Sequence, residues 1–227
     1  QSDGGYAERI RVPAANVIRL PDAIDFVSAA AFPLSFLTAW HMLLTRAQLT
    51  GRDTVLVLAA GSGVGQAAIQ IAKVFRARVI ATAGHPEKLD RATALGADFV
   101  INHASDDVVA SVKKITAGRG VDVVIEHVGV ATWERSVRCL ARGGRLVTCG
   151  ATTGHDARLD LRHLFARQLS LLGSYMGGKA ELLRAADLFF RGEFRPAIDM
   201  TLPLSEAAQA QRRLESGAQF GKIVLTV

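Results

Sequence analysis

The stretch from residue 54 to residue 73 combines a buried-strand pattern, a glycine-rich turn and a helix pattern in direct succession. Residues 54–58 are nearly all β-branched or leucine, which is typical of a parallel strand buried on both faces. Gly61, Gly63 and Gly65 then allow the backbone to take up positive φ and to approach a ligand closely. A helix that begins there directs its free N–H groups and its positive dipole end at the turn. The stretch therefore predicts a seat for a phosphate group.

The turn departs from the strict G-x-G-x-x-G fingerprint of dinucleotide-binding proteins, because Ala60 and Ser62 stand at the first two glycine positions. Taken alone, it also fits a tight strand-to-helix connection without any ligand. Ser62 raises a third alternative, the nucleophile elbow G-x-S-x-G of an α/β-hydrolase. Ala60 and Val64 occupy the two glycine positions of that elbow and argue against it.

Strand and helix patterns alternate along the chain after this turn. Gly96, Gly118 and Gly143 are predicted to end helices in the left-handed conformation. Parallel strands need crossover connections, so the alternation predicts an α/β fold with a Rossmann-type, doubly wound, six-stranded parallel sheet. After the first strand, strands are predicted at residues 78–83, 98–101, 121–127, 145–149 and 169–174, and helices at 86–95, 106–116, 131–140 and 161–167.

The two ends of the chain do not fit this alternation. A short strand is predicted at residues 6–12 and a helix at residues 39–49, ahead of the first sheet strand. The other end reads as extended segments at 199–204 and 222–227 with a helix at 205–215 between them. Neither end can bury a core alone, so both are predicted to belong to another structural unit.

Composition excludes several classes of protein. The 227 residues are 49% hydrophobic and 21% charged, which is ordinary for a globular chain. No apolar run approaches the roughly 20 residues of a membrane span. The net charge of +6 is scattered without a run of like charges, so nucleic-acid binding is not predicted. Cys139 and Cys149 lack metal-ligand spacing, and we interpret them as reduced, buried residues of a cytoplasmic protein.

Motifs spread over the whole chain resemble the medium-chain dehydrogenase/reductase superfamily, in its zinc-type alcohol dehydrogenase and quinone oxidoreductase branches. The resemblance implies an NAD(P)(H)-dependent oxidoreductase that transfers hydride between nicotinamide and a small-molecule quinone, enone, aldehyde or alcohol. The motifs are at residues 4–8 (GGYAE), 29–40 (AAAFPLSFLTAW), 59–65 (AAGSGVG), 95–98 (LGAD), 120–124 (GVDVV), 143–147 (GGRLV) and 220–225 (FGKIVL).

The resemblance also implies a division of the chain. Residues 1–34 match the end of a GroES-like catalytic domain of which most is missing, residues 35–176 the dinucleotide-binding domain, and residues 177–227 a segment that returns to the catalytic domain. Leu34 stands where zinc-dependent members place a cysteine ligand, and leucine cannot bind zinc. No metal site is therefore expected in this chain. A fragment of a zinc-type alcohol dehydrogenase and a non-catalytic nucleotide-binding or oligomerisation module remain alternatives.

The cofactor residues follow from the turn and from the end of the second strand. The turn residues Gly61, Ser62, Gly63, Val64 and Gly65 are predicted to seat the pyrophosphate. NAD-binding folds place a carboxylate on the ribose about twenty residues later.

Here the second strand ends at Ala83 and Gly84 without one, which also argues against a Rossmann-like methyltransferase. Lys88 and His103 are placed to meet a 2′-phosphate, so NADP(H) is predicted over NAD(H). Alternatively, Lys88 is a solvated helix lysine and His103 a loop histidine.

The resemblance further implicates residues near the nicotinamide: Thr38 as a contact of the ring or its amide, Lys222 near the phosphates or ribose, and the strand ends around Val128, Gly150, Ser174 and Met176. Thr38 can instead bond to its own helical turn, and Lys222 can be a plain edge-strand lysine. No proton donor is assigned, because His41 and Tyr175 are better interpreted as packing residues. The family commonly pairs two edge strands, so a homodimer through residues 169–174 is expected.

Overall fold

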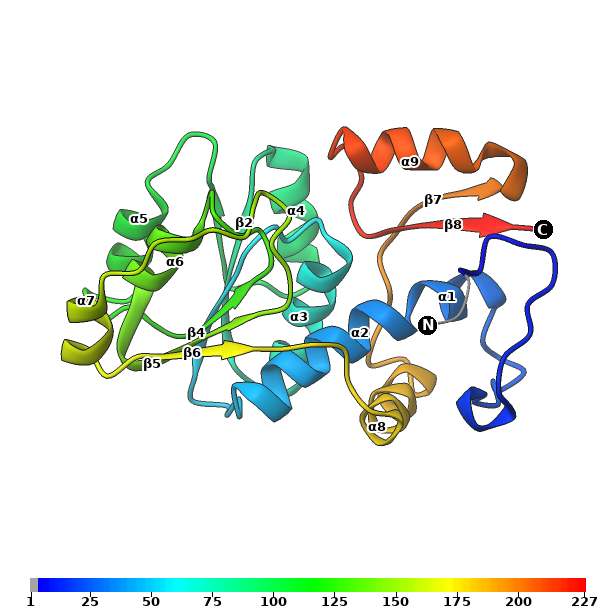
Figure 1. Ribbon diagram of the computed structural model, residues 1–227, viewed down its shortest axis with the longest axis horizontal. Coiled ribbons are helices and arrows are strands. Elements are labelled where there is room, and N and C mark those ends of the chain that lie inside the picture. The colour runs from blue at the N-terminus through cyan, green and yellow to red at the C-terminus, as the bar shows by residue number, and fades with distance from the viewer. Residues whose placement is uncertain (1–3) are drawn as a thin grey trace.

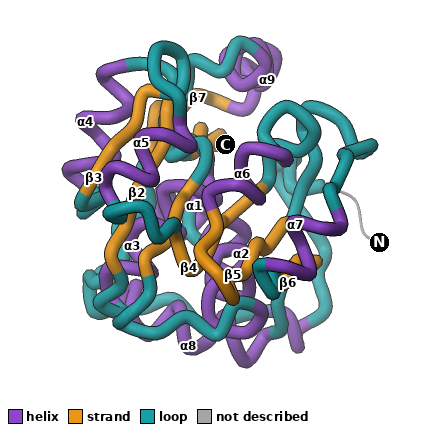
Figure 2. Tube along the Cα trace, turned by 90° about the vertical axis from the view of Figure 1, so that its left-hand side faces the viewer, coloured by secondary structure: helices purple, strands orange, loops and turns teal. Residues whose placement is uncertain are grey.

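The computed structural model describes residues 4–227 and contains a six-stranded and a two-stranded sheet, both parallel (Figure 1). The larger sheet has the order β3-β2-β1-β4-β5-β6, and Figure 2 shows its strands in that order from one side of the molecule to the other. The predicted Rossmann-type sheet is thereby confirmed. Its strands are β1 (Thr54–Val57), β2 (Arg78–Ala83), β3 (Phe99–Asn102), β4 (Val121–Glu126), β5 (Leu140–Thr148) and β6 (Ser170–Gly173).

Helices cover both faces of this sheet. Because successive strand residues point to opposite faces, Val55 and Val57 of β1 enter one core and Leu56 enters the other, and all three are fully buried. Burial on both faces explains the continuous apolar run that marked this strand. The crossover helices are α3 (Gly63–Val74) and α4 (Pro86–Ala94) on one face, and α5 (Val108–Ile115) and α6 (Trp133–Cys139) on the other, with α7 (Leu161–Ala166) leading into β6.

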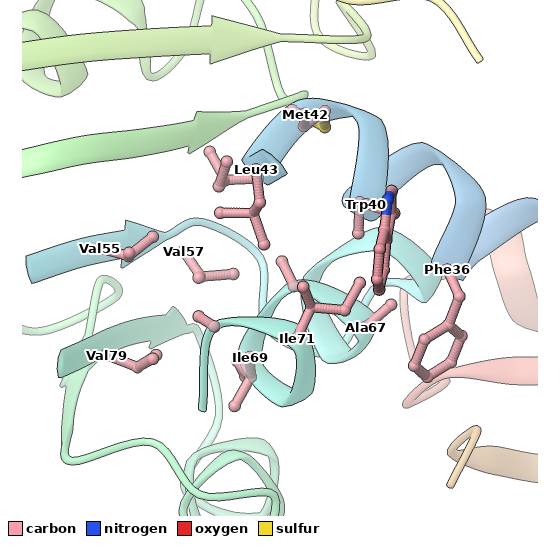
Figure 3. Close-up of a cluster of buried hydrophobic side chains, with 14 of the residues drawn as sticks. Phe36, Trp40, Met42, Leu43, Val55, Val57, Ala67, Ile69, Ile71 and Val79 are labelled. Carbon is pink, nitrogen blue, oxygen red and sulfur yellow. The ribbon is translucent and has the colours of Figure 1, made fainter. Parts of the chain in front are cut away.

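The first core is built around helix α2 (Pro33–Trp40), which packs on α3 (Figure 3). Phe36 and Trp40 project from α2 toward the helix that carries Ile71. Helix α2 also contacts α8 (Lys179–Phe190), and the ring of Phe32, directly before α2, stacks on that of Phe189 at 4.4 Å. The chain leaves α2 through a π-helical turn, His41–Arg46, before β1 begins.

The two ends of the chain meet in a second unit. The strands β7 (Ile198–Pro203) and β8 (Lys222–Thr226) form the small sheet, joined by a short 3₁₀ turn and helix α9 (Ala207–Glu215). Helix α1 (Phe26–Ala31), from the beginning of the chain, contacts both strands (Figure 1). The two ends of the chain therefore contact each other, and their assignment to a separate domain stays a prediction.

Several predicted elements were wrong in detail. Residues 6–12 form no strand, because they are exposed and pair with no strand in the described part of the chain. The predicted helix at 39–49 begins earlier, where Pro33 occupies the first turn of α2. Helix α6 ends at Cys139, so Gly143, with φ +74°, lies inside β5 rather than at a helix end. Gly96 and Gly118 have positive φ after α4 and α5, as predicted.

None of the helices in residues 4–227 has the length and hydrophobicity that crossing a membrane requires. Both cysteines are free thiols, Cys139 buried and Cys149 half-buried. Burial raises the pKa of Cys139 to about 12 and that of Cys149 to about 11, so neither forms a thiolate readily at neutral pH.

Candidate functional site

The topology gathers the predicted site residues at one edge of the large sheet. The glycine turn follows β1, Gly84 follows β2, and His103 follows β3. Val128 and Gly150 follow β4 and β5. The carboxyl ends of parallel strands share one edge, and the chain reverses its order between β1 and β4, so a crevice is expected there.

The glycine turn can close only because it lacks side chains. A Cβ on Gly65 would lie 2.3 Å from the carbonyl oxygen of Ala59. Ala59 itself has φ +47°, a left-handed conformation that costs energy in an alanine. A Cβ on Gly63 would lie 2.7 Å from Ser35 Oγ. The closure of the turn therefore depends on Gly65, and the close approach of α2 to the turn depends on Gly63.

The beginning of α3 presents hydrogen-bond donors to this crevice. Ser62 is the N-cap residue, and its Oγ accepts a 2.8 Å hydrogen bond from the Gly65 N–H. The N–H groups of Gly63 and Val64 have no backbone acceptor among residues 4–227. Together with the positive end of the helix dipole, these donors form a site suited to an anion.

A histidine that the sequence analysis did not predict lies across the chain reversal from this turn. Nε2 of His127, directly after β4, lies 2.9 Å from Ser62 Oγ. Burial lowers the pKa of His127, and the nearby charge of Glu126 offsets this only in part. The only signal in the sequence was its place at a strand end, since nothing along the chain reveals the contact between β4 and the turn.

A cleft of about 310 Å³ extends from the turn toward the end of β2. The structure thus brings together five predicted residues, and it adds His85 and the loop before β8. A Cβ on Gly84 would lie 3.1 Å from His103 Nε2, so these two pack closely. The lining residues are Ala59, Gly61, Ser62, Ala83, Gly84, His85, Lys88, His103, Gly217 and Gln219.

Lys88 and His103, the two basic residues of this cleft that the sequence predicted, differ in charge. The Lys88 ammonium donates a hydrogen bond to the Gly217 carbonyl. Burial lowers the Lys88 pKa, and Asp199 opposes the shift. Burial also lowers the pKa of His103, with Arg135 and His85 adding to the effect. His103 is therefore an uncharged imidazole at neutral pH, and Lys88 is the cation of the pair.

A second cleft of about 470 Å³ lies beside Lys88 and contains an ion-pair cluster that the sequence analysis missed. The Asp199 carboxylate accepts hydrogen bonds of 2.5 and 3.3 Å from Arg213 and lies 3.8 Å from Arg91. Arg91 also stacks over the ring of Phe220, 4.3 Å from its centroid. The cluster joins α4, which covers one face of the large sheet, to β7 and α9 of the second unit.

Thr38, on α2, adopts the local alternative considered from the sequence. Its hydroxyl donates a 2.7 Å hydrogen bond to the Leu34 carbonyl, one helical turn earlier. Lys222, the first residue of β8, packs its stem over Gly63, and burial lowers its pKa. Thr38 retains acceptor capacity, because a hydroxyl oxygen has two lone pairs.

The loop after β6 contains an unsatisfied hydroxyl. Ser174 Oγ is buried and makes no hydrogen bond within the described residues, which is unusual in a folded protein. Met176 follows with φ +54°, and Tyr175 is 86% exposed. His41 is engaged elsewhere, since its Nδ1 lies 2.9 Å from the Glu181 carboxylate.

No group of three or more histidine, cysteine, aspartate or glutamate residues within residues 4–227 is arranged to hold a metal ion. Leu34 is 55% exposed at the start of α2.

A parallel sheet with a glycine turn and a donor-rich helix N-terminus at its chain reversal defines a dinucleotide-binding fold. Comparison with known proteins agrees: residues 63–191 match the zinc-binding dehydrogenase family. The chain is also 35% identical to the quinone oxidoreductase of Pseudomonas aeruginosa, over 98% of this chain and 71% of that enzyme. The chain therefore belongs to the zinc-binding dehydrogenase family, in the medium-chain dehydrogenase/reductase superfamily.

Solved structures extend the likeness. A crystal structure of an NAD-dependent alcohol dehydrogenase superposes with a TM-score of 0.95 at 46% identity, covering 99% of this chain and 65% of that one. The 2-octenoyl-CoA carboxylase reductase CinF, in complex with NADP and 2-octenoyl-CoA, gives 0.83 at 34% identity, covering 90% and 50%. Among relatives found by sequence, the chain is 34% identical to the lovastatin diketide synthase of Aspergillus terreus, of which it spans 10%.

Proposed function

We propose that this chain is the nicotinamide-nucleotide-binding part of an oxidoreductase that transfers hydride between the nicotinamide and a quinone, enone, aldehyde or alcohol. The observation that carries the proposal is the turn at the chain reversal, where Gly65 closes on the Ala59 carbonyl and Gly63 and Val64 present free N–H groups. A pyrophosphate is the ligand for which such a turn is suited. The quinone oxidoreductase and CinF relatives support the reaction class.

The residues present fit a dinucleotide along the whole edge of the sheet. The pyrophosphate would lie on residues 61–65, with Lys222 beside it, and the adenosine in the cleft of Gly84, Lys88 and His103. The nicotinamide would lie near Thr38, Ser174 and the strand ends at Val128, Gly150 and Met176, and the buried, unpartnered Ser174 hydroxyl supports this placement. The cofactor supplies the hydride chemistry, and the chain supplies orientation and electrostatics.

We further propose that NADP(H) is preferred over NAD(H). The second strand ends at Ala83 and Gly84 without the carboxylate that would repel a 2′-phosphate, and Lys88 supplies a cation in the same cleft. His103 can contribute a hydrogen bond rather than a charge, because its pKa is lowered. One relative is NAD-dependent and another binds NADP. The relatives therefore do not decide between the two cofactors, and the proposed preference rests on Ala83, Gly84 and Lys88.

Zinc chemistry is not proposed for this chain's own residues, because Leu34 occupies the position of the family's cysteine ligand. Reduction of a quinone or enone needs a proton that solvent can deliver, and neither His41 nor Tyr175 is placed to act as a dedicated donor: His41 is bonded to Glu181 and Tyr175 is exposed. The substrate would lie against the nicotinamide end of the crevice. The preferred substrates are therefore electron-poor quinones and enones.

Two experiments test the function. The 227-residue chain is titrated with NADPH and NADH by nicotinamide fluorescence, and turnover is assayed with a quinone and an enone, in this chain and in a version extended upstream. Binding by both forms with turnover in the extended form supports an oxidoreductase whose catalytic domain precedes these residues. Binding by both without turnover in either favours the alternative, a non-catalytic nucleotide-binding module.

The domain division and assembly are part of the proposal. Contacts of α1 with β7 and β8 support grouping residues 1–34 with 177–227, around a dinucleotide-binding domain at 35–176.

On its outer side β6 pairs with no strand in residues 4–227, which supports a homodimer through residues 169–174. Light scattering that reports a monomer at micromolar concentration would contradict the dimer. The free cysteines support a cytoplasmic location.

A further inference from the structure

One ring nitrogen of the candidate site has no partner. Nδ1 of His127 is buried and makes no hydrogen bond within the described residues, whereas Nε2 contacts Ser62 Oγ at 2.9 Å. Because burial lowers its pKa, the imidazole is neutral at neutral pH. One ring nitrogen then carries a hydrogen and the other only a lone pair. The position of that hydrogen decides which hydrogen bonds Ser62 can make.

The two tautomers differ in their cost. With the hydrogen on Nδ1, a buried N–H group would be left without an acceptor, and such orphaned donors are rare in folded proteins. With the hydrogen on Nε2, the ring donates to Ser62 Oγ, and only a lone pair stays unpaired. The second tautomer leaves no buried N–H of His127 unsatisfied, so the geometry favours it.

In that tautomer Ser62 receives two hydrogen bonds, from His127 Nε2–H and from the Gly65 N–H at 2.8 Å. A serine hydroxyl has two acceptor lone pairs and one hydrogen to donate. Both lone pairs are then used, so the hydroxyl can only donate. Ser62 lines the 310 Å³ cleft next to the free N–H groups of Gly63 and Val64.

We propose that His127 is a positioning residue that commits the Ser62 hydroxyl to donate a hydrogen bond to a phosphate oxygen of the dinucleotide. The inference rests on the proposed function and assigns the chain a recognition element beyond the glycine turn. Hydrogen bonds to charged oxygens are stronger than neutral ones. A hydroxyl that can only donate favours an anionic oxygen over any group that offers a donor.

The backbone around His127 is fixed for this role. The Glu126 carboxylate, with no exposed surface, accepts hydrogen bonds from the N–H of Val128 at 2.6 Å and of Gly129 at 3.1 Å. It also accepts 2.8 Å hydrogen bonds from the hydroxyls of Thr132 and Ser136.

On the other side, the Thr152 hydroxyl donates to the His127 carbonyl at 3.1 Å. With its backbone held in this way, the His127 ring contacts Ser62 in the turn after β1 and loses little freedom when a ligand binds.

Substitutions at both ends of the contact test the proposal in the 227-residue chain, with Kd for NADPH measured by fluorescence and thermal unfolding as a folding control. Ser62→Ala is expected to raise Kd about tenfold. His127→Phe, which removes the donor, is expected to raise it about fivefold, whereas His127→Gln keeps an N–H and is expected to stay within about twofold. In the Ser62→Ala background, His127→Phe is expected to add nothing, because the two residues act through one contact.

The tautomer gives a readout that requires no variant and no cofactor. Nitrogen-15 NMR of the histidine ring in the wild-type protein is expected to report hydrogen on Nε2. Hydrogen on Nδ1, or additive effects of the two substitutions, would overturn the inference. Wild-type binding with an unchanged Kd in His127→Phe would overturn it while leaving the proposed function intact. Failure of the wild type to bind either NADPH or NADH would remove the proposed function and, with it, the role of His127.

Discussion

The turn at residues 59–65 and the pocket around Lys88 lie in the same cleft but are built differently. The closure of the turn is set by close neighbours in sequence, with Gly65 against Ala59 and Ser62 capping its own helix, and His127 adds one distant contact. The pocket depends on a distant segment, because Lys88 bonds to Gly217, 129 residues away. The first region is therefore formed largely by local contacts, and the second is assembled when the loop before β8 packs against α4.

This difference separates two properties of a nucleotide site. A preformed turn provides affinity for the pyrophosphate that all dinucleotides share. An assembled pocket provides selectivity for the ribose, and it changes whenever α4 and the C-terminal unit move relative to each other. We therefore expect substitutions in the turn to weaken binding of both dinucleotides, and substitutions around Lys88 to change the preference between them.

The largest effect is expected for Gly65→Ala. Its Cβ would lie 2.3 Å from the Ala59 carbonyl oxygen, so the turn must shift, at a cost of about 3 kcal/mol in the free energy of unfolding. NADPH and NADH binding should weaken together. Gly178→Ala is the matched control, because its nearest neighbour lies 3.9 Å away and its φ of −87° suits alanine. Chemical denaturation and fluorescence titration measure both effects, and unchanged affinity in Gly65→Ala would contradict a closed turn.

A smaller effect, dependent on pH, is expected for Asp199→Asn. Burial raises the Asp199 pKa, but hydrogen bonds from Arg213 and from the Phe220 N–H outweigh it and hold the pKa below 3.8. Its contribution to stability is therefore present above pH 3.8 and is lost as the pH falls through the lowered value.

The stability gap between wild type and Asp199→Asn should shrink on acidification from about pH 6 to about pH 3. Asp187→Asn, which alters an exposed pair with Arg191, is the control and should show a small gap throughout. Denaturant titrations at each pH give the free energies of unfolding. A gap for Asp199→Asn that widens in acid would contradict the assigned ion pair.

A change in selectivity is expected for Lys88→Gln. Loss of a charge-assisted hydrogen bond to the 2′-phosphate should raise Kd for NADPH about tenfold, while Kd for NADH stays within about twofold. Lys113→Gln, an exposed lysine on α5, should change neither. Equal weakening for both dinucleotides would show that Lys88 supports the fold of the pocket rather than reading the phosphate.

The smallest effect is expected for Thr38→Val. The hydroxyl already donates to the Leu34 carbonyl, so it can only accept from the nicotinamide amide. We expect Kd for NADPH to rise about threefold, with little change in unfolding temperature. A loss of more than about a hundredfold would mean that Thr38 donates to the cofactor and leaves its helical bond.

The sequence alone predicted the large sheet and the residues that follow most of its strands. Strands buried on both faces produce continuous apolar runs, and every residue predicted after a strand lies at the same edge. Helix α8 was not predicted, although residues 182–189 carry a helical apolar spacing. The strand at 6–12 was wrong because apolar alternation alone does not provide a pairing partner.

The rest of the site depends on tertiary contacts. The contact of His127 with Ser62 joins residues 65 positions apart, and nothing in the local pattern distinguishes His127 from a loop histidine. The Arg91, Asp199 and Arg213 cluster likewise depends on tertiary contacts, because Asp199 of β7 meets Arg91 of α4 and Arg213 of α9. The uncharged state of His103 results from burial, which the sequence pattern did not reveal.

The central claim is that the edge of the large sheet binds a nicotinamide dinucleotide, with Lys88 favouring the phosphorylated form. Parallel fluorescence titrations of the 227-residue chain with NADPH and NADH at neutral pH and low salt test it directly. We predict saturable binding of both dinucleotides, with the lower Kd for NADPH. Tighter binding of NADH would contradict the preference, and absence of saturable binding of either would contradict the site itself.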